Sequence, residues 1–319
     1  MRIGIDLGGT KIEALAIDDE GRELGRQRRP TPRDSYESIL DAVVALVGDV
    51  EAEVGAQGTV GLGIPGTISP ATGLVKNANT TALIGHPLDR DLAARLGNRV
   101  RVANDANCFA LSEAADGAGA PTSPRQPGQS PHVVFGVIIG TGTGGGVVVD
   151  GQILDGPDGI GGEWGHMPLP WPQEDEWPLP KCWCGRSGCV ELFLSGTGLA
   201  ADHKRVTGES LSGPEVAQAA AAGSAAALAT MARYEHRLAR GLAVIINVLN
   251  PQVIVLGGGV SNVERLYTNV PELWKPYAFS DVVSTRLVKA KHGDSSGVRG
   301  AAWLWPVGAA AELGLGAKR

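Results

Sequence analysis

The stretch Arg2–Ile17, RIGIDLGGTKIEALAI, decides the fold. Apolar residues alternate with other residues on both sides of Gly8-Gly9, which is typical of two β-strands joined by a tight turn. A further turn signal precedes a third predicted strand near Glu23–Arg29, so the chain begins with a pattern that indicates an antiparallel meander. Apolar residues at helical spacing then predict a helix over Tyr36–Val54.

The pattern of strand, glycine turn and strand returns in the middle of the chain. Strands are predicted at His132–Ile139 and Gly145–Val149, with glycines and threonines between them. The alternation of strands with helices indicates an α/β protein, and the repeated pattern indicates two α/β lobes. We expect a smaller lobe from residues 1–117, joined by a C-terminal helix within 298–319, and a larger lobe from residues 118–297.

Shorter patterns predict the remaining elements. Apolar runs bounded by turn residues predict strands at Thr59–Ile64, Val100–Ala103 and Gln252–Leu256. Helical spacing and alanine-rich composition predict helices at about 104–117, 213–249, 262–276 and 298–305. The Gly/Pro/Ser-rich stretch 117–131 is expected to form an exposed loop, and the tail 307–319 is expected to be frayed.

Composition excludes several classes of protein. The chain has 319 residues, of which 43% are apolar and 19% charged, as expected for a soluble globular enzyme. Its net charge of -6 and its lack of a Lys/Arg-rich run argue against nucleic acid as a general partner. No apolar run reaches the length of a membrane span, and the first strand begins at residue 2, which leaves no room for a secretory signal. We therefore expect a cytoplasmic protein without membrane or nucleic-acid partners.

Three of the four cysteines lie in one short segment, CWCGRSGCVE (182–191), and a histidine lies sixteen positions upstream of it. Three thiolates and one imidazole suit a four-coordinate zinc ion, so the predicted metal ligands are His166, Cys182, Cys184 and Cys189. The alternative is a disulfide with a spare thiol, which is less favoured because nothing else indicates an oxidising compartment. Glu163 and Glu191 lie beside the cluster and could face a ligand.

The glycine-rich turns are candidate phosphate sites. Gly140-x-Gly142-x-x-Gly145 superficially fits the dinucleotide fingerprint, but a strand follows it where the fingerprint requires a helix, and no Walker A loop is present. Two Gly/Thr turns could bind one polyphosphate through backbone N–H groups and hydroxyls, although either turn alone could be a plain hairpin. The predicted nucleotide-binding residues are Asp6 (through magnesium and water), Gly8, Gly9, Thr10, Lys11, Gly140, Thr141, Gly142, Thr143, Gly257, Gly258 and Gly259. Lys11 could equally be solvated, and the last three glycines could pass under an adenine ring.

A polar sequence, Asn104-Asp105-Ala-Asn107, follows a short strand and begins a helix. Asn and Asp are preferred as N-caps, which is the structural alternative. In the functional interpretation Asp105 takes a proton from a hydroxyl that attacks phosphorus. Polar residues able to bind several sugar hydroxyls recur elsewhere: Asn79, Asn104, Glu163, His166 and Glu191, with the Gly63-Ile-Pro-Gly66 turn. Cys108 is expected to be a packed helix thiol.

Eight motifs together carry a resemblance to a known family. They are DLGGTK (6–11), GIPG (63–66), NANTT (77–81), ANDANC (103–108), IGTGTGGG (139–146), GEWGH (162–166), CWCGRSGCVE (182–191) and LGGGVSN (256–262). In this order they resemble the ROK family of sugar kinases, and AKHGDSSGVRGAAWLW (290–305) resembles its fructokinase/mannokinase branch. The resemblance implies an actin/hexokinase-like (ribonuclease H-like) ATPase fold with two lobes around a cleft, and commonly a homodimer.

The resemblance also implies roles for individual residues. Asp105 would be the general base, and Gly8, Gly9, Thr10, Gly142 and Thr143 would hold the phosphates of ATP, with Mg²⁺ present. The sugar would be held by Gly66, Asn79, Asn104, Glu163, His166 and Glu191. The zinc would be structural, with four protein ligands and no open position, and would shape the sugar side of the site.

The expected reaction is ATP-dependent phosphorylation of a hexose at its 6-hydroxyl, with fructose, and mannose beside it, as first choice. The alternatives are a glucokinase and an N-acetylglucosamine or N-acetylmannosamine kinase. A non-catalytic sugar sensor is disfavoured because Asp105 and both glycine turns are present, and a repressor of this family would need a helix-turn-helix domain ahead of the turn that begins at residue 6. Many members carry a tryptophan shortly after the equivalent of Asn79, whereas Thr80-Thr81-Ala82-Leu83 has none, which predicts a reshaped sugar pocket.

Overall fold

The computed structural model describes residues 1–123 and 129–316, and the chain forms two compact units. The first unit contains Met1–Ala120, Ile153–Gly161 and Asp294–Arg319, and the second contains Pro121–Gln152 and Gly162–Gly293. The sequence pattern assigned 153–161 to the second lobe, whereas the structure includes it in the first unit. There Gly159 lies so close to strand β5 that a Cβ on it would be 3.3 Å from the hydroxyl oxygen of Thr67.

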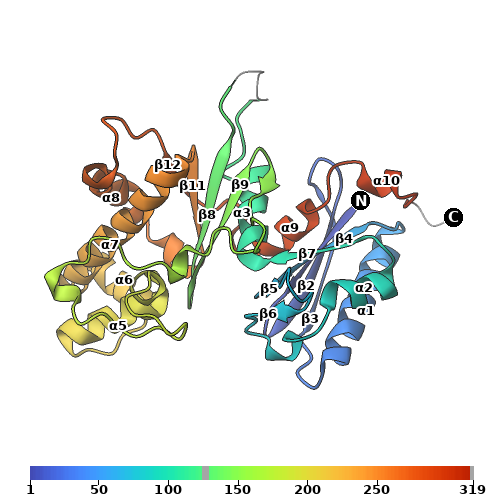
Figure 1. The fold of residues 1–319 in the computed structure, drawn as a ribbon, viewed down its shortest axis with the longest axis horizontal. Helices are drawn as coiled ribbons and strands as arrows, with labels where there is room; N and C mark the ends of the chain where they lie inside the picture. The colour runs from blue at the N-terminus through green and yellow to red at the C-terminus, as the bar shows by residue number, and fades with distance from the viewer. Residues whose placement is uncertain (124–128, 317–319) are drawn as a thin grey trace. The chain divides into compact units, whose positions relative to one another are not determined.

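The first unit is a five-stranded sheet with helices on both faces (Figure 1). Its strand order is β3-β2-β1-β4-β7, with β1 (Arg2–Leu7) antiparallel to β2 (Lys11–Ile17) and parallel to β4 (Thr59–Ile64). Strand β3 (Glu23–Pro30) pairs with β2, and β7 (Val100–Asn104) pairs in parallel with β4. The meander predicted around Gly8-Gly9 is therefore confirmed.

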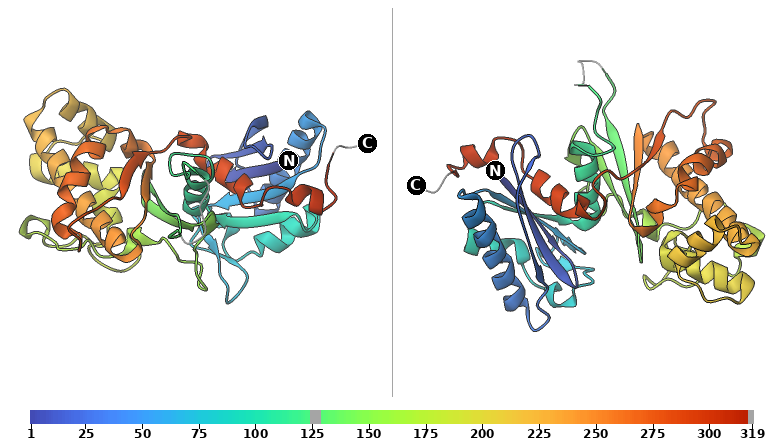
Figure 2. Two further views of the ribbon diagram at one scale, coloured as in Figure 1. Left: turned by 90° about the horizontal axis from the view of Figure 1, so that it is seen from above. Right: turned by 180° about the vertical axis from the view of Figure 1, so that it is seen from behind.

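Helices α1 and α2 cover one face of this sheet, and α3 and α9 lie together on the other (Figure 2). Their bounds are α1 (Tyr36–Val54), α2 (Leu88–Leu96), α3 (Asp105–Ala115) and α9 (Ser296–Trp303). Helix α1 begins where Ser35 and Ser38 form a reciprocal cap and ends at Gly55 in the left-handed conformation.

Glycines allow the backbone of α9 to contact the backbone of the sheet and of α3 directly. A Cβ on Gly4 of β1 would lie 1.9 Å from the carbonyl oxygen of Val298, and one on Gly61 of β4 would lie 1.8 Å from that of Ala301. A Cβ on Gly300 would lie 1.6 Å from the carbonyl oxygen of Cys108 in α3. Since any side chain at these positions would clash with backbone, α9 is packed tightly into the core of the first unit.

The second unit is a sheet with order β10-β9-β8-β11-β12, packed against a group of helices (Figure 1). Its strands are β8 (Val133–Ile139), β9 (Thr143–Val149), β10 (Gln152–Ile153), β11 (Val253–Gly257) and β12 (Arg286–Lys289). Its helices are α4 (Glu191–Leu194), α5 (Gly196–Thr207), α6 (Gly213–Ala221), α7 (Ala225–Leu249) and α8 (Arg265–Leu273). One core joins Phe135 and Leu256 of the sheet to Leu238 of α7 and to Trp164.

Several sequence predictions need correction. The helix predicted over 213–249 is two helices, because Gly223 has a positive φ of 89° and Ser224 caps α7. Helices α2 and α5 and strands β5 (Thr67–Ile68), β6 (Val75–Lys76) and β12 were not predicted. The tail predicted to be frayed contains α10 (Ala309–Glu312), whose Ala309 is buried. Residues 124–128 of the predicted loop and 317–319 of the tail lie outside the described residues.

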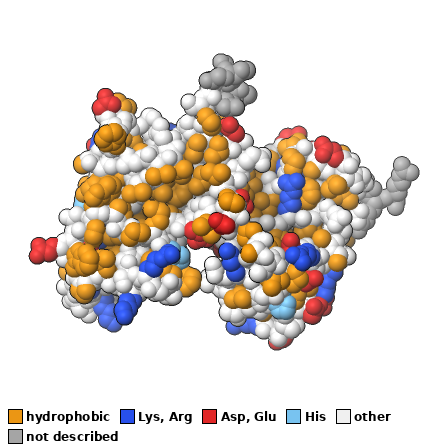
Figure 3. Space-filling view, in the orientation of Figure 1, with side chains coloured by type: hydrophobic (Ala, Val, Ile, Leu, Met, Phe, Trp, Pro, Cys, Tyr) orange, Lys and Arg blue, Asp and Glu red, His pale blue; other side chains and the backbone are white. Residues whose placement is uncertain are grey.

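Among the described residues, no helix combines the length and the apolar character needed to cross a bilayer. On the face drawn in Figure 3, charged side chains are interspersed over the first unit, and hydrophobic ones gather over the second. The large exposed hydrophobic side chains of the second unit include Val248, Phe279 and Val282. Exposed apolar side chains do not by themselves show a partner, so the expected homodimer stays a prediction.

Candidate active site

The candidate base lies where β7 ends and α3 begins. Asn104 is the N-cap, and its side-chain oxygen accepts hydrogen bonds from the backbone N–H groups of Ala106 (2.9 Å) and Asn107 (3.4 Å). Asp105 is the first residue of α3, is half-buried, and accepts a hydrogen bond from the N–H of Ala106 at 2.8 Å. The helix N-terminus favours a negative charge there. The capping role therefore belongs to Asn104, and the Asp105 carboxylate is held by the same turn.

Two other predicted sugar-binding residues lie beside this cap in the first unit. The Nδ2 group of Asn104 donates to the carbonyl oxygen of Gly66 at 3.1 Å, and the N–H of Asn79 donates to the carbonyl oxygen of Pro65 at 3.2 Å. The exposed side chain of Asn79 is thus held beside the Pro65-Gly66 turn. Gly66 has φ 155°, and a Cβ on it would lie 2.8 Å from the carbonyl oxygen of Lys76, so this position requires glycine.

The first glycine turn presents free amides. The N–H of Gly8 donates to the carbonyl oxygen of Lys11 at 3.0 Å, which closes the turn. Gly9 and Thr10 are exposed, and their N–H groups donate to no other described residue. Nζ of Lys11 lies 3.6 Å from Oε2 of Glu13, so the Lys11 side chain forms an ion pair with a nearby residue of the same strand. Gly9 and Thr10 therefore offer the anion-binding groups of this turn.

Asp6 lies at the end of β1 beside this turn. Its half-buried carboxylate makes no hydrogen bond or ion pair with any residue that the structure describes. Burial raises the pKa of Asp6, the nearby Glu13 carboxylate raises it further, and Lys11 partly offsets both effects. A carboxylate that loses hydration without gaining a partner is suited to a cation such as hydrated Mg²⁺.

The second glycine turn joins β8 to β9 in the second unit. The N–H of Gly140 donates to the carbonyl oxygen of Gly142 at 3.0 Å, whereas the exposed Thr141 and Gly142 have amides that donate to nothing in the described ranges. The N–H of Thr143, a predicted phosphate ligand, donates to Oε2 of Glu191 at 3.1 Å, and its buried hydroxyl oxygen has no partner among the described residues. The free amides of this turn are therefore those of Thr141 and Gly142.

Further glycines pack against the base of this second turn. Gly258 has φ 81°, and a Cβ on it would lie 2.4 Å from the carbonyl oxygen of Ile139. Gly257 ends β11, and Gly259 has open space where a Cβ would be. The predicted glycine trio therefore brings bare backbone beside the Gly140 turn, as an adenine-binding surface requires.

One part of this region was missed from the sequence. The N–H of Gly196 donates to the carbonyl oxygen of Gly140 at 2.7 Å, and the hydroxyl of Thr197 donates to that of Thr141 at 2.8 Å. Both residues begin α5, after the N-cap Ser195. The second Gly-Thr-Gly sequence, at 196–198, is the signal that could have identified them.

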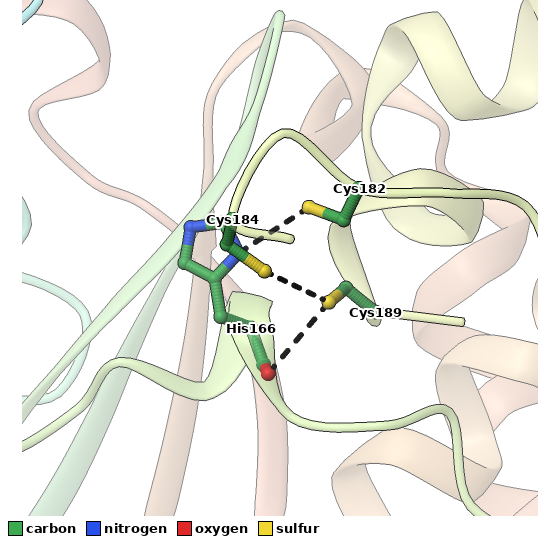
Figure 4. Close-up of side chains that lie close together, drawn as sticks. All are labelled: His166, Cys182, Cys184 and Cys189. Carbon is green, nitrogen blue, oxygen red and sulfur yellow. Dashed lines mark hydrogen bonds between the residues drawn. The ribbon is translucent and has the colours of Figure 1, made fainter. Parts of the chain in front are cut away.

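The predicted metal ligands converge in the second unit (Figure 4). One ligand atom from each of His166, Cys182, Cys184 and Cys189 lies within 4.8 Å of all the others. Nδ1 of His166 is 3.7 Å from Sγ of Cys182, and the sulfurs of Cys184 and Cys189 are 3.5 Å apart. Two ligands of one tetrahedral zinc ion are about 3.8 Å apart, given Zn–S bonds of about 2.3 Å. All four cysteines of the chain are free, so the disulfide alternative is wrong.

The protonation of the cluster also fits a cation. The backbone N–H of Arg186 lowers the pKa of Cys184, whereas burial and the neighbouring thiols raise that of Cys189 to about 12. Thiols this close cannot all ionise without a positive charge among them. A Zn²⁺ ion would supply that charge, and the four side chains present would fill its coordination sphere.

A buried ion-pair network holds the loop that carries the cluster. Glu176 lies in the short helix Glu174–Glu176 and accepts hydrogen bonds from Nε of Arg237 (2.8 Å) and from Arg240, both on α7. Burial alone would raise the pKa of Glu176, but the hydrogen bonds from Arg240 and Arg237 lower it overall. Arg237 also pairs with Asp202 of α5 at 3.1 Å. Sequence reasoning missed this network.

The predicted polar residues of the second unit lie around the cluster. Glu191 accepts from the N–H of Thr143 and, at 3.0 Å, from Nε1 of Trp183, whose ring meets the His166 ring edge-on at 4.8 Å between centroids. Nδ1 of His166 faces the sulfurs, which leaves its other ring nitrogen for a different partner (Figure 4). Glu163 is exposed two residues before Gly165.

Each unit therefore holds some of the residues predicted to bind ATP, metal or sugar. The first holds Asp6, Gly9, Thr10 and Asp105 with the Gly66 turn, and the second holds the Gly140 turn, Glu163, Glu191 and the metal cluster. These are the groups that phosphate, magnesium, sugar hydroxyls and zinc require.

Comparisons with known proteins identify the family. The chain is 40% identical over 311 residues to an N-acetyl-D-glucosamine kinase of Vibrio parahaemolyticus, and 41% identical over 309 residues to one of Escherichia coli O1:K1. Each alignment covers 95% of this chain and 99% of the relative.

Solved structures agree with this relationship. A ROK hexokinase from Thermus thermophilus has a TM-score of 0.80 and 31% identity, covering 95% of this chain and 96% of that one. A ROK family glucokinase from Streptomyces griseus, in complex with glucose and AMPPNP, has a TM-score of 0.72 and 28% identity, covering 95% and 98%. The fold is therefore the actin/hexokinase-like α/β fold. The model of the ROK family matches residues 2–307. The chain belongs to the ROK family.

Proposed function

We propose that this protein phosphorylates N-acetylglucosamine at its 6-hydroxyl with ATP. Membership of the ROK family and kinase relatives over 95% of the chain support an ATP-dependent sugar kinase. The names of the relatives match N-acetylglucosamine, one of the alternative substrates above, better than fructose or mannose. The observation that carries the chemistry is Asp105 at the end of β7, beside the Asn104–Gly66 hydrogen bond.

Asp105 would act as the general base. As the 6-hydroxyl oxygen of the sugar attacks the γ-phosphorus of ATP, its proton passes to the Asp105 carboxylate, and the bond from phosphorus to the bridging oxygen of ADP breaks. Asn104 fixes the turn that holds this carboxylate and keeps one Nδ2 hydrogen for the sugar, since its other donates to Gly66. Phosphoryl transfer needs mainly positioning and charge neutralisation, so one well-placed carboxylate suffices.

The phosphates would be held by backbone amides. Each glycine turn offers two free N–H groups, on Gly9 and Thr10 in the first unit and on Thr141 and Gly142 in the second. Asp6 would hold Mg²⁺ through water, and the ion would neutralise charge on the phosphates.

On the sugar side, Asn79, Glu163, Glu191 and the free ring nitrogen of His166 would bind hydroxyls. Glu191 is oriented by hydrogen bonds from Thr143 and Trp183. The zinc would be structural, since four protein ligands leave no open position for substrate. We propose that it keeps His166 and Glu191 in place.

A substrate panel tests the assignment. With ATP and Mg²⁺, we expect kcat/KM for N-acetylglucosamine to exceed those for N-acetylmannosamine, glucose, fructose and mannose by about tenfold or more, the discrimination that polar groups in a pocket commonly give. Phosphorus NMR should identify the 6-phosphate. A kcat/KM for fructose equal to or above that for N-acetylglucosamine would contradict the proposal and restore the fructokinase interpretation.

Asp6→Asn should separate catalysis from stability. We expect kcat to fall on the order of 10²-fold, because an amide holds a hydrated cation poorly. The folded state raises the pKa of Asp6, so the ionised carboxylate destabilises the fold above that pKa and has no effect below the pKa of the unfolded chain. Urea unfolding at pH 7.5 should therefore show Asp6→Asn as equally or more stable, with the gain lost as the pH falls through the pKa of folded Asp6. Lower stability at pH 7.5 would contradict this.

Gly142→Ala should weaken sugar binding through Glu191. A Cβ on Gly142 would lie 2.7 Å from Oε2 of Glu191, the oxygen that accepts the Thr143 hydrogen bond. Loss of this charge-assisted bond should raise the KM for the sugar roughly tenfold. Gly140→Ala is the matched control, because a Cβ there has nothing within 4 Å. Equal sugar KM values in the two variants would refute the coupling.

A further inference from the structure

A small cavity lies beside the candidate base, entirely within the first unit. Its volume is about 200 Å³, and its wall comes from the ends of β4 and β7, from β5, from the start of α3 and from the segment Asp155–Gly159. Asn104, the cap of α3 and a proposed sugar ligand, forms part of this wall. A substituent on a sugar that contacts Asn104 would therefore have space to enter the cavity.

Among the polar residues of this wall, Asn107 is the buried one, and its side chain has no structural task. Its backbone N–H donates to Asn104, but its side-chain carboxamide makes no hydrogen bond with any residue that the structure describes. The side chain is nonetheless buried, since Asn107 is only 7% exposed, and its Oδ1 is shielded without a partner. Buried carboxamides are normally hydrogen-bonded, so an unpaired one at a cavity wall points to a ligand.

Part of the cavity wall is aliphatic and could contact a small apolar group. Ile64, Ile68 and Val102 contribute aliphatic surface beside the Asn107 carboxamide. An acetamido group combines a carbonyl acceptor, an N–H donor and a methyl group. A carboxamide can pair with both polar atoms, and the aliphatic wall can take the methyl. A hydroxyl could satisfy at most part of the carboxamide and would leave the aliphatic wall uncovered.

We propose that this cavity binds the acetamido group of the sugar and that Asn107 determines specificity for N-acetylated hexosamines. This inference rests on the proposed function, because it assigns a subsite to the same substrate. Asn107 acts on the choice of sugar and takes no part in the transfer of the phosphoryl group. The missing tryptophan after Asn79 is a separate feature and is not needed for this assignment.

Asn107→Leu tests the proposal, because leucine has nearly the same shape and lacks both polar atoms. We expect kcat/KM for N-acetylglucosamine to fall at least about tenfold, while kcat/KM for glucose changes less than about threefold. Titration calorimetry should show the same selective loss of N-acetylglucosamine binding. If the leucine variant does not fold, Asn107→Ser is the second variant. It also removes the carboxamide but adds less apolar bulk, and it should show the same selective loss.

Ser112→Ala is the matched control. Ser112 lies on the same helix, and its buried hydroxyl also lacks a partner, but it is not part of the cavity wall. This variant should keep the ratio of kcat/KM for the two sugars. An unchanged ratio in folded Asn107 variants of an enzyme that does phosphorylate N-acetylglucosamine overturns the cavity assignment and leaves the proposed function standing. A wild-type enzyme without activity on N-acetylglucosamine overturns both.

Discussion

Asp105→Asn should lower kcat for sugar phosphorylation by about 10²- to 10⁴-fold, the usual contribution of a general base. Asparagine has the shape of aspartate, and its side-chain oxygen can still accept the hydrogen bond from the N–H of Ala106. It cannot accept the proton of the attacking hydroxyl. Sugar affinity measured by calorimetry should therefore stay within about threefold of wild type. The substitution at most replaces one charged hydrogen bond to the sugar with a neutral one. The effect should appear in kcat rather than in binding.

A control for this variant exists in the same unit. Asp89 is also a half-buried carboxylate in the first turn of a helix, α2, and it has no proposed role in the site. Asp89→Asn should leave kcat within about twofold of wild type, as expected for a change away from the chemistry. A kcat for Asp105→Asn that stays within tenfold of wild type would remove Asp105 from the role of base, whatever its effect on sugar binding.

The part of the fold that could be predicted is the part held by local signals. Helix α1 has its predicted bounds because apolar spacing, a serine cap and a terminal glycine all agree within twenty residues. Helix α5 was missed because its buried face includes Asp202 and His203. Asp202 can be buried since Arg233 and Arg237 of α7 neutralise it from thirty or more positions away. Arg205 within α5 also pairs with Asp202, at 2.8 Å, but no pattern within α5 indicates the two arginines of α7.

In the site too, local sequence signals could be read, whereas contacts between distant residues could not. The four candidate metal ligands could be predicted because three of them are neighbours in sequence, and Asp105 was predicted as the base because it follows a strand end. Sequence could not show that the amide of Thr143, a predicted phosphate ligand, is taken by Glu191, a residue 48 positions away. Asn107 was not singled out because its isolation depends on a cavity built by three separate segments, 64–70, 102–107 and 155–159. Sequence shows which groups are present, and tertiary structure decides which of them remain free.

Loss of zinc should weaken sugar binding more than nucleotide binding. We expect the purified protein to contain about one zinc per chain by mass spectrometry of the metal, and Cys184→Ser to contain much less, because three ligands hold structural zinc poorly. Without the ion the thiols repel one another when ionised, and the loop from His166 to Cys189 loses its main crosslink. His166 and the Glu191–Trp183 hydrogen bond depend on that loop. The KM for the sugar should therefore rise at least about tenfold.

The nucleotide side provides an internal comparison. The Gly140 turn is held by the β8–β9 pairing and by Gly196, and neither contact involves a metal ligand. The KM for ATP should therefore change less than about threefold. Cys108→Ala is a control that should keep the zinc, because Cys108 is buried in α3, outside the cluster. Burial there raises the pKa of its thiol well above the ordinary value. Zinc-free protein with normal sugar KM would show that the loop keeps its shape unaided. In that case the ion-pair network of Glu176 with Arg237 and Arg240 would be the sufficient support for the loop.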